Sequence, residues 1–566
     1  MDLLIRIAGE AGQGVQTTGN LLVAAFARMG LHVFAIKSYM SRIRGGLNWF
    51  DVRIGDATLY SGRETADVLV ALTDEARETL QPHVADGGAT LFDAAPDEAD
   101  APEGCLCVPL TAIAKEKGGS AVMANAVAAG AVFALLGYDL SALTDYFGEA
   151  FAKKGEETVQ ANVACAEAGA ERLGDQAGRL ASPDPGGEAV SVATGTEAVG
   201  LAAATAGVKF ATAYPMTPAT GVLTVLAGAA DEYGIVVEQA EDEIAAVNMV
   251  CGAVYAGVPA LTMTSGGGFA LMAEGVSLAG MHELPVVILL AQRPGPATGL
   301  PTRTAQQDLL FALHAGHGEF PRAIFAPGTP EQAYHLTRRA LKTAHKFQTP
   351  VILMTDQFLA DMVVDTPPLD AAPDPIDRQI AADAGQGYDR FAVTDSGVSP
   401  RAVPGGDAFV LLDSDAHTED GHITEDLEAH LGQQDKRMRK LDAMTEKALA
   451  PDRYGPPDAG LLLLCWGSTY GPCREAVDRL RAAGTKAAML HFGQVWPLKA
   501  RAVRRAVGLE GDDARPPDRI VCVEGNQTSQ FRTVLREAGV GVEAEPLVRY
   551  DGMPFTGEEI AERVQA

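Results

Sequence analysis

The stretch from Tyr214 to Thr304 gathers hydroxyls, carboxylates, glycines and arginines, groups that can bind a ligand or transfer a proton. Thr217 lies between two prolines in AYPMTPAT, residues 213–220, and the fixed φ of proline limits the freedom of this loop. A hydroxyl on such a stiff loop can donate a hydrogen bond to a ligand at a small cost in ordering entropy. The alternative role for Thr217 is that of a helix N-cap.

Four carboxylates stand just before a helical run of small residues, 245–257. They are Glu238, Glu241, Asp242 and Glu243. Acidic residues at a helix start are ordinary partners of the helix dipole. The small residues permit close packing, however, and a carboxylate drawn into an apolar site has a raised pKa and can share a proton with a ring nitrogen. The residues by themselves leave open which carboxylate this is.

Glycines and arginines follow on the same stretch. TSGGG places three consecutive glycines, residues 266–268, between an expected strand and an expected helix, where a backbone without side chains can approach a ligand closely. The Pro- and Gly-rich loop 289–309 carries Arg293 and Arg303. An arginine fork pairs both oxygens of a carboxylate, and loops at strand ends are where α/β proteins bind ligands.

The elements that must position these residues alternate between strand and helix, which predicts an α/β fold. Residues 286–291 and 351–355 are uniformly apolar or β-branched, as in a parallel sheet covered on both faces. Near the N-terminus, a strand at 3–8, the glycine-rich turn GEAGQG and a helix at 15–29 form a further α/β start. Such a turn suits an anion at the helix N-terminus, although its spacing is not a full GxGxxG.

Composition changes divide the chain into five parts. The Pro-, Gly- and acid-rich run ASPDPGGEA marks an interdomain linker. We predict an α/β domain at 1–180, a linker at 181–192, a second α/β domain at 193–370, an irregular connecting segment with a helical part at 371–455, and a third α/β domain at 456–566.

Net charge, the length of the apolar runs and the cysteine pattern argue against several classes of protein. The net charge of −29 disfavours non-specific nucleic-acid binding, which depends on basic residues. The apolar runs are too short to span a membrane, so a cytoplasmic enzyme is expected. Seven scattered cysteines without a CxxC are not expected to hold an iron–sulfur cluster within this chain.

The motifs together resemble the α subunits of 2-oxoacid:ferredoxin oxidoreductases. YPMTPAT, the acidic run before a small-residue helix, TSGGG and QRPGPATGLPTRTAQQDL occur in the order that this family shows. CWGST, HFGQVWPL and VEGNQTSQF resemble its transketolase-like C-terminal domain, and GEAGQG and SRIRGGLNWFDVRIG resemble its γ domain, fused here ahead of α. The resemblance implies a γ-type domain, a pyrimidine-binding domain for thiamine diphosphate and a transketolase C-terminal-like domain.

The resemblance also implies roles for single residues. Glu243 would hydrogen-bond the aminopyrimidine ring of thiamine diphosphate, with Glu241 and Glu238 as competing candidates. Thr217 would bond the 2-oxoacid, and Arg293 would pair with its C1 carboxylate. The remaining candidates line the cofactors: Tyr214, Pro215, Gly266 and Gly267 at thiamine diphosphate, and Gly12, Gln13 and Gly14 at a phosphate of coenzyme A, where structural packing is the alternative.

A partner is implied as well, because the chain has no GDG…NN motif to hold Mg²⁺ and the diphosphate. A β subunit would supply that site and the [4Fe-4S] cluster in an (αβ)₂ assembly that reduces ferredoxin, and this chain would hold no metal and be inactive by itself. The fused layout most resembles the 2-oxoglutarate enzymes, which make succinyl-CoA and CO₂; pyruvate, branched-chain and indolepyruvate enzymes stay open.

A dicarboxylic substrate would need a cation for its distal carboxylate, since an unpaired buried charge is costly. Arg303, Arg42 and Arg44 are the candidates for this role, and surface ion pairing is the alternative for each.

Two other functional classes remain. One is a thiamine enzyme that uses lipoamide or NAD, which the QRPGPATG loop disfavours. The other is a stand-alone coenzyme A or nucleotide-binding protein, which the presence of Glu243 disfavours.

Overall fold

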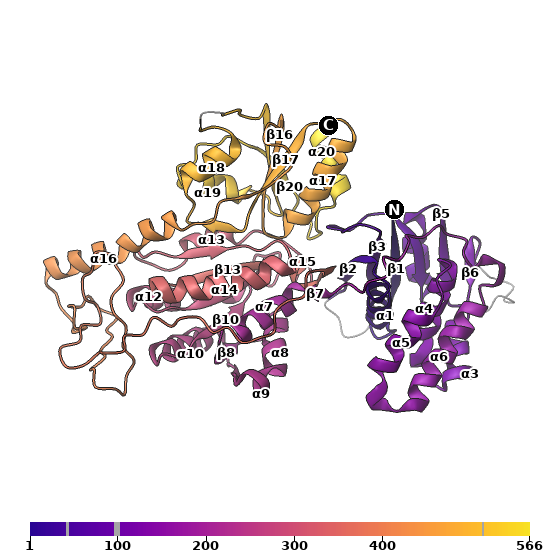
Figure 1. Cartoon of the computed structure of the whole chain (residues 1–566), viewed down its shortest axis with the longest axis horizontal. Coiled ribbons are helices and arrows are strands. Elements are labelled where there is room, and N and C mark those ends of the chain that lie inside the picture. The colour runs from indigo at the N-terminus through magenta and orange to yellow at the C-terminus, as the bar shows by residue number, and fades with distance from the viewer. Residues whose placement is uncertain (41–44, 95–101, 512–513) are drawn as a thin grey trace. The chain divides into compact units, whose positions relative to one another are not determined.

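The computed structural model describes residues 1–40, 45–94, 102–511 and 514–566 of the chain (Figure 1). Two compact units are present. Unit 1 comprises Met1–Ala193 and Asp361–Pro368, and unit 2 comprises Thr194–Ala360 and Leu369–Ala566. In the described part of the chain, no helix is both long and apolar enough to cross a membrane.

Unit 1 is built on one sheet. Its strand order is β6-β5-β4-β1-β3-β2-β14-β7. The strands are β1 (Asp2–Glu10), β2 (His32–Ser38), β3 (Leu47–Gly55), β4 (Ala66–Ala71), β5 (Val84–Phe92), β6 (Cys105–Cys107), β7 (Val192–Thr194) and β14 (Val363–Asp365). The helices are α1 (Val15–Arg28), α2 (Asp74–Leu80), α3 (Leu110–Gly118), α4 (Ala124–Leu135), α5 (Ser141–Ala150) and α6 (Glu156–Glu171). Phe26 of α1 stacks on Phe133 of α4, with 5.0 Å between ring centroids, inside the buried core of this unit.

Strand β14 comes from a distant part of the sequence. It pairs antiparallel with β2, and ion pairs fix the segment on both sides of it. His32 Nδ1 lies 2.9 Å from Asp365 Oδ2, and Lys37 Nζ lies 2.8 Å from Asp361 Oδ1. Residues 361–368 therefore lie in unit 1, although the sequence placed them within the part 193–370. The five-part division itself stays a prediction.

Unit 2 contains a central sheet with the order β18-β12-β13-β11-β10-β8-β9. Its strands are β8 (Phe210–Ala213), β9 (Val236–Gln239), β10 (Ala260–Thr264), β11 (Val287–Gln292), β12 (Ala323–Phe325), β13 (Val351–Asp356) and β18 (Gln494–Trp496). All neighbours from β12 to β9 run parallel, and β18 pairs antiparallel with β12. The expected parallel sheet is confirmed.

Helices cover both faces of this sheet, as the uniformly apolar strands predict. Ile288 and Leu290 of β11 face one buried cluster, and Val287 and Leu289 face another. The helices of the central part are α7 (Gly195–Thr205), α8 (Thr220–Gly228), α9 (Ala230–Tyr233), α10 (Glu243–Tyr255), α11 (Gly266–Leu271), α12 (Ala273–Met281), α13 (Leu309–His314), α14 (Pro330–Phe347) and α15 (Gln357–Asp361).

The C-terminal part of unit 2 has its own sheet, with the order β15-β17-β16-β19-β20. The strands are β15 (Asp452–Tyr454), β16 (Leu461–Trp466), β17 (Ala487–Phe492), β19 (Arg519–Glu524) and β20 (Glu545–Val548). The helices are α17 (Tyr470–Ala482), α18 (Ala500–Val507), α19 (Gln530–Glu537) and α20 (Gly557–Gln565). Because β18 leaves this part to join the central sheet, the two sheets of unit 2 share a boundary.

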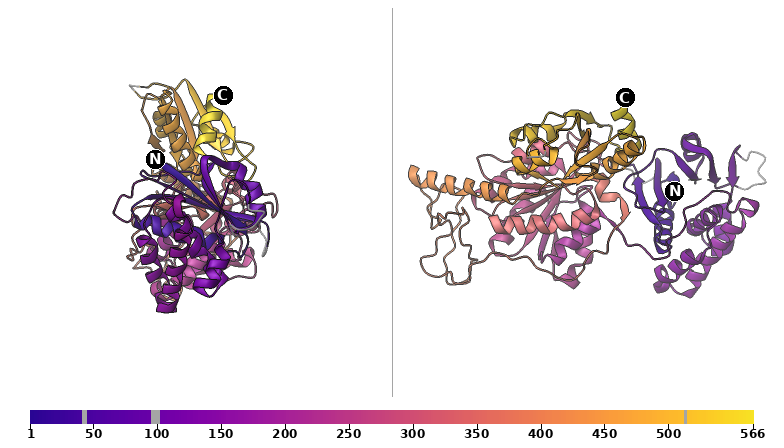
Figure 2. Two further views of the ribbon diagram at one scale, coloured as in Figure 1. Left: turned by 90° about the vertical axis from the view of Figure 1, so that its right-hand side faces the viewer. Right: turned by 45° about the horizontal axis from the view of Figure 1, so that its top comes forward.

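The segment between the two sheets is irregular up to α16 (Leu427–Glu446), the long orange helix of Figures 1 and 2. Its inner face is anchored by a buried ion cluster. Lys436 Nζ lies 2.7 Å from Glu283 Oε1, Lys440 pairs with the other oxygen, and all three side chains are fully buried. Burial would raise the pKa of Glu283, but Lys440, Lys436 and Arg390 outweigh it and hold that pKa well below its usual range.

Candidate active site

Apart from Glu243, which follows β9, the candidate residues of unit 2 follow three adjacent parallel strands. The loop 214–219 follows β8, the TSGGG glycines follow β10, and Arg293 follows β11. Strands β8, β10 and β11 are neighbours in the sheet, so their carboxyl ends meet at one edge. This is the edge at which open α/β sheets bind ligands.

Glu243 is the first residue of α10 and differs from the other nearby carboxylates in its burial. Asp242 caps the helix, with Oδ1 accepting from the backbone N–H of Ala245 at 2.7 Å. Glu243 is 2 % exposed and its Oε1 has no hydrogen-bond partner, whereas Glu238 and Glu241 are exposed. A buried acceptor without a donor is costly, so this oxygen is suited to a donor from a ligand.

The glycine run after β10 lies directly against this carboxylate. A Cβ on Gly268 would be 2.4 Å from Glu243 Oε1 and 2.1 Å from Thr264 Oγ1, so the position accepts no side chain. Gly267 is exposed, and the nearest atom to a Cβ there is the carbonyl oxygen of Ala297 at 3.8 Å. The run thus packs on Glu243 at one end and leaves backbone accessible at the other.

Thr217 and Arg293, two of the residues predicted to bind the substrate, are in direct contact. Arg293 Nη1 donates to the backbone carbonyl of Thr217 at 2.9 Å. Partial burial lowers the pKa of the Arg293 guanidinium, which stays far above neutral pH as arginine does in proteins. On the same loop Tyr214 is 42 % exposed and Pro215 is half-buried, so both present surface at this edge of the sheet.

Arg303 points to a different neighbourhood from Arg293. A Cβ added to Gly552 would lie 3.0 Å from the Cβ of Arg303. The next residue, Thr304, donates its backbone N–H to the carbonyl of Gly552 at 3.1 Å. Partial burial lowers the pKa of Arg303. Arg303 therefore lies beside the C-terminal part of unit 2, while Arg42 and Arg44 fall outside the described residues.

The glycine turn of unit 1 connects β1 with α1. Gly14 is the N-cap, with φ of 86°, and a Cβ on it would lie 2.1 Å from Asn125 Oδ1. Gly12 is exposed, with open space where a Cβ would be, and Gln13 Oε1 accepts from the N–H of Glu10 at 2.8 Å. Gly14 is thus required by packing, whereas Gly12 leaves room for a ligand.

Comparisons with known proteins agree with this geometry. Residues 201–435 match the family model described as pyruvate flavodoxin/ferredoxin oxidoreductase, thiamine diphosphate-binding, and residues 4–172 match the pyruvate ferredoxin/flavodoxin oxidoreductase model. A 2-oxoacid:ferredoxin oxidoreductase subunit alpha from a Sulfolobus species is 30 % identical over 98 % of this chain and 95 % of its own length. The chain belongs to the 2-oxoacid:ferredoxin oxidoreductase family, as an α-type subunit.

Two further relatives of this oxidoreductase chain carry a substrate in their names. The 2-oxoglutarate oxidoreductase subunit KorA of Mycobacterium tuberculosis is 30 % identical over 100 % of this chain and 91 % of its own. The 2-oxoglutarate:ferredoxin oxidoreductase of Magnetococcus marinus, solved with 2-oxoglutarate, coenzyme A and succinyl-CoA bound, is 33 % identical, with a TM-score of 0.91 over 100 % of this chain and 99 % of that one.

The structure adds a carboxylate that the sequence reasoning did not single out. Asp308 precedes α13, and a Cβ on Gly266 would lie 2.7 Å from its Oδ2, which is buried without a hydrogen-bond partner. Burial raises the pKa of Asp308 to about 6. The backbone N–H of Asp308 donates to Gln292 Oε1 at 3.1 Å. The available signal was its place at the end of the motif PTRTAQQDL.

The donor and acceptor set around the glycine run fits the aminopyrimidine of thiamine diphosphate, the cofactor of the oxidoreductase family. Such a ring presents donors and acceptors along one edge. Glu243 offers a free buried acceptor, and the buried Ser265 Oγ, also without a partner, offers a donor and further acceptors. The exposed backbone of Gly267 leaves room beside them.

Proposed function

We propose that this chain is the α subunit of a 2-oxoglutarate:ferredoxin oxidoreductase and works only with a separate β-type subunit. The observation that carries the thiamine site is the unpaired, buried Oε1 of Glu243 beside Gly268. The 2-oxoglutarate assignment is supported by the KorA relative and by the Magnetococcus marinus enzyme, which cover almost the whole chain. Pyruvate, branched-chain 2-oxoacids and indolepyruvate are the competing substrates.

The proposed reaction is an oxidative decarboxylation that depends on coenzyme A. 2-Oxoglutarate, coenzyme A and oxidised ferredoxin give succinyl-CoA, CO₂ and reduced ferredoxin, and the reverse reaction is a reductive carboxylation. Thiamine diphosphate, when bound, would supply a nucleophilic carbon and an electron sink for the decarboxylation. The residues of this chain bind the cofactor ring and orient the substrate.

Glu243 has the role of holding a proton at the aminopyrimidine ring. Its burial removes water from the carboxylate, so that a hydrogen bond to a ring nitrogen is strong and well oriented. Arg293 has the role of pairing the C1 carboxylate of the 2-oxoacid. Its contact with the Thr217 carbonyl fixes the guanidinium next to the hydroxyl that we assign to the substrate.

The partner supplies what this sequence lacks. We propose that the β-type subunit carries the diphosphate site, Mg²⁺ and a [4Fe-4S] cluster, because this chain has no GDG…NN motif and no CxxC. The name "subunit alpha" of the Sulfolobus relative supports a multi-subunit enzyme. Ferredoxin is the proposed electron acceptor, and Gly12, Gln13 and Gly14 are the proposed contacts for a coenzyme A phosphate.

The distal carboxylate of 2-oxoglutarate needs a cation, and Arg303 is the described candidate. It is partly buried beside Gly552 and lies on the same loop as Arg293, and an arginine fork can pair both oxygens of a carboxylate. Arg42 and Arg44 are the alternatives, and the structure does not describe them.

Steady-state kinetics of the complex made by producing both subunits together test the function. We expect wild type to prefer 2-oxoglutarate over pyruvate and 2-oxoisovalerate in kcat/KM, and we expect the isolated chain to show neither turnover nor iron. Arg303→Met should lose kcat/KM selectively for 2-oxoglutarate. Equal losses on all three substrates would reject Arg303, and a preference for pyruvate would reject the substrate assignment.

A further inference from the structure

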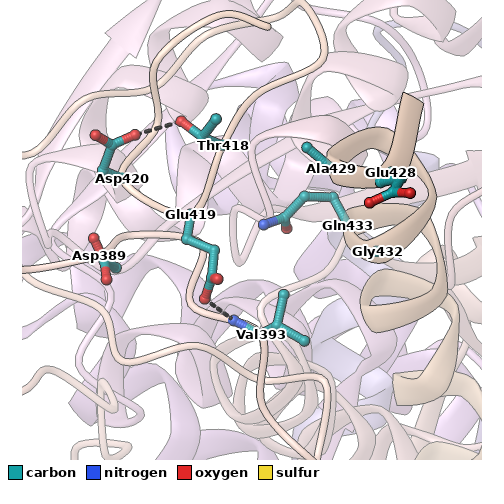
Figure 3. Close-up of a pocket in the computed structure, with 9 residues that line it drawn as sticks. All are labelled: Asp389, Val393, Thr418, Glu419, Asp420, Glu428, Ala429, Gly432 and Gln433. Carbon is teal, nitrogen blue, oxygen red and sulfur yellow. Dashed lines mark hydrogen bonds between the residues drawn. The ribbon is translucent and has the colours of Figure 1, made fainter. Parts of the chain in front are cut away.

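An open pocket of about 500 Å³ lies between the irregular segment of unit 2 and the first turns of α16 (Figure 3). Four of the nine residues that line it are carboxylates: Asp389, Glu419, Asp420 and Glu428. No lysine, arginine or histidine lines this pocket in the part of the chain that the structure describes. Its lining therefore offers acceptors and negative charge.

Gln433 adds an independent sign that a donor belongs in this pocket. The side chain is 4 % exposed and extends from α16 into the pocket (Figure 3). Its Nε2 donates to the backbone carbonyl of Phe391 at 2.9 Å. A carbonyl only accepts, so this bond fixes the orientation of the amide. The other amide atom, Oε1, is then left buried without a partner.

The pocket wall opposite α16 is held by hydrogen bonds within the chain. Glu419 Oε2 accepts from the N–H of Val393 at 2.7 Å, and the Glu419 carbonyl accepts from the N–H of Phe391 at 2.7 Å. Thr418 bonds the carboxylate of Asp420. The two Glu419 bonds join loops that are distant in sequence, so the Glu419 acceptor is in place before a ligand binds, which reduces the entropy cost of binding.

Exposed apolar side chains lie next to these acceptors. Val393 lines the pocket and is 46 % exposed. Leu427 and Leu431, four residues apart on α16, are 82 % and 60 % exposed, and they flank the lining residue Glu428. Residues at this spacing share one face of a helix. Acceptors beside an apolar face favour an arginine or lysine that projects from another protein surface, because both parts of the surface are then covered.

We propose that this pocket binds an arginine or lysine side chain of the partner subunit, with apolar residues of that subunit on Leu427 and Leu431. The cation would supply the donor that Gln433 Oε1 lacks and would pair with the carboxylates of the lining. A second copy of this chain is disfavoured because each copy carries a net charge of −29. Only the identity of the partner rests on the proposed function.

The affinity between the separately purified subunits tests the proposal. In Glu419→Gln/Glu428→Gln, both acceptor side chains keep their shape but lose their charge. The matched control is Glu425→Gln/Asp435→Asn, which removes two exposed carboxylates of the same segment outside the pocket. We expect the pocket variant to raise Kd roughly three- to thirtyfold at low salt and to weaken the salt dependence of Kd. A Kd that matches that of the control would overturn the proposal.

Hydrogen–deuterium exchange on wild type gives a second readout that needs no variant. We expect peptides covering residues 389–393 and 417–433 to become protected when the partner subunit is added. No protection, or protection that rises with the concentration of this chain by itself, as a second copy would cause, would overturn the proposal. Turnover is measured in parallel: a complex that forms through this pocket but turns over no 2-oxoacid rejects the proposed function and keeps the docking site.

Discussion

At the scale of residues, two carboxylates flank one glycine run. Glu243 lies against Gly268 and Asp308 lies against Gly266, and each has a buried oxygen without a hydrogen-bond partner. Unpaired buried oxygens destabilise a chain unless a ligand supplies the missing donors. Their presence at one sheet edge supports the proposed binding site.

We expect Glu243→Gln to lower kcat by about 10²–10⁴-fold while the complex with the partner subunit stays assembled. The amide keeps the shape of the side chain but cannot hold a negative charge at the ring. Glu241→Gln and Glu238→Gln are the matched controls, because both residues are exposed. Steady-state kinetics with size-exclusion chromatography are the measurements; near-normal kcat in the Glu243 variant would move the role to another carboxylate.

Asp308 gives a prediction about pH. Burial raises its pKa from 3.8 to about 6, so between about pH 4 and pH 6 the folded chain binds a proton that the unfolded chain has released. Stability therefore falls as pH rises through this interval. Asp308→Asn removes the effect.

The difference in Tm between pH 5 and pH 8, measured by calorimetry on the isolated chain, should shrink by about 1–4 °C in Asp308→Asn. Asp435→Asn, an exposed carboxylate on α16, is the control and should leave the difference unchanged. An unaltered difference in Asp308→Asn would show that Asp308 stays ionised throughout this range.

At the scale of elements, α16 is held to the core by charge rather than by an apolar stripe. Few of its residues are buried apolar side chains, whereas Lys436 and Lys440 reach Glu283 and Arg390 donates to the carbonyls of His282 and Glu283. Burial lowers the pKa of Lys440 to about 8, although Glu283 opposes this shift. The pocket proposed to bind the partner subunit is lined in part by the start of α16, so its shape depends on these ion pairs.

Lys440→Met should destabilise the segment between residues 369 and 446 by about 2–4 kcal/mol, because it leaves the Glu283 carboxylate with fewer partners in a buried site. We expect faster trypsin cleavage within this segment and a lower Tm. The control is Lys342→Met on α14, since Lys342 is exposed. Equal cleavage rates in both variants would show that α16 is anchored mainly by other contacts.

At the scale of the whole molecule, each unit depends on residues that are distant in sequence. Unit 1 needs residues 361–368, which add β14 beside β2. In unit 2 the central sheet receives β18 from the C-terminal part. The chain therefore cannot be cut into units at a single position without removing a strand from one of them.

Asp361→Asn/Asp365→Asn should lower the thermal transition of unit 1 by a few degrees, because the half-buried pairs with Lys37 and His32 lose their charge. Calorimetry on the full chain measures the shift of the unit 1 transition when the two units unfold in separate transitions. Asp383→Asn/Asp395→Asn, two exposed carboxylates of unit 2, is the control. A shift of the unit 2 transition instead would contradict the assignment of this segment to unit 1.

The sequence by itself determined the family and the parallel sheet. Both depend on local patterns. Apolar runs such as 286–291 predict strands covered on both faces, and motifs such as TSGGG are recognised from consecutive residues alone. Strand β11 and its neighbours confirm this prediction. The roles of Glu243, Thr217 and Arg293 stay proposals that the geometry supports.

The tertiary structure decided which carboxylates are buried and which segments meet. Glu238, Glu241 and Glu243 look alike in sequence, and only the packing of α10 against Gly268 buries one of them. Asp308, the return of residues 361–368 to unit 1 and the lone acceptor of Gln433 have the same origin. Each depends on contacts between residues far apart in the chain, and burial and long-range pairing follow from how the elements pack, which no local pattern of residue types contains.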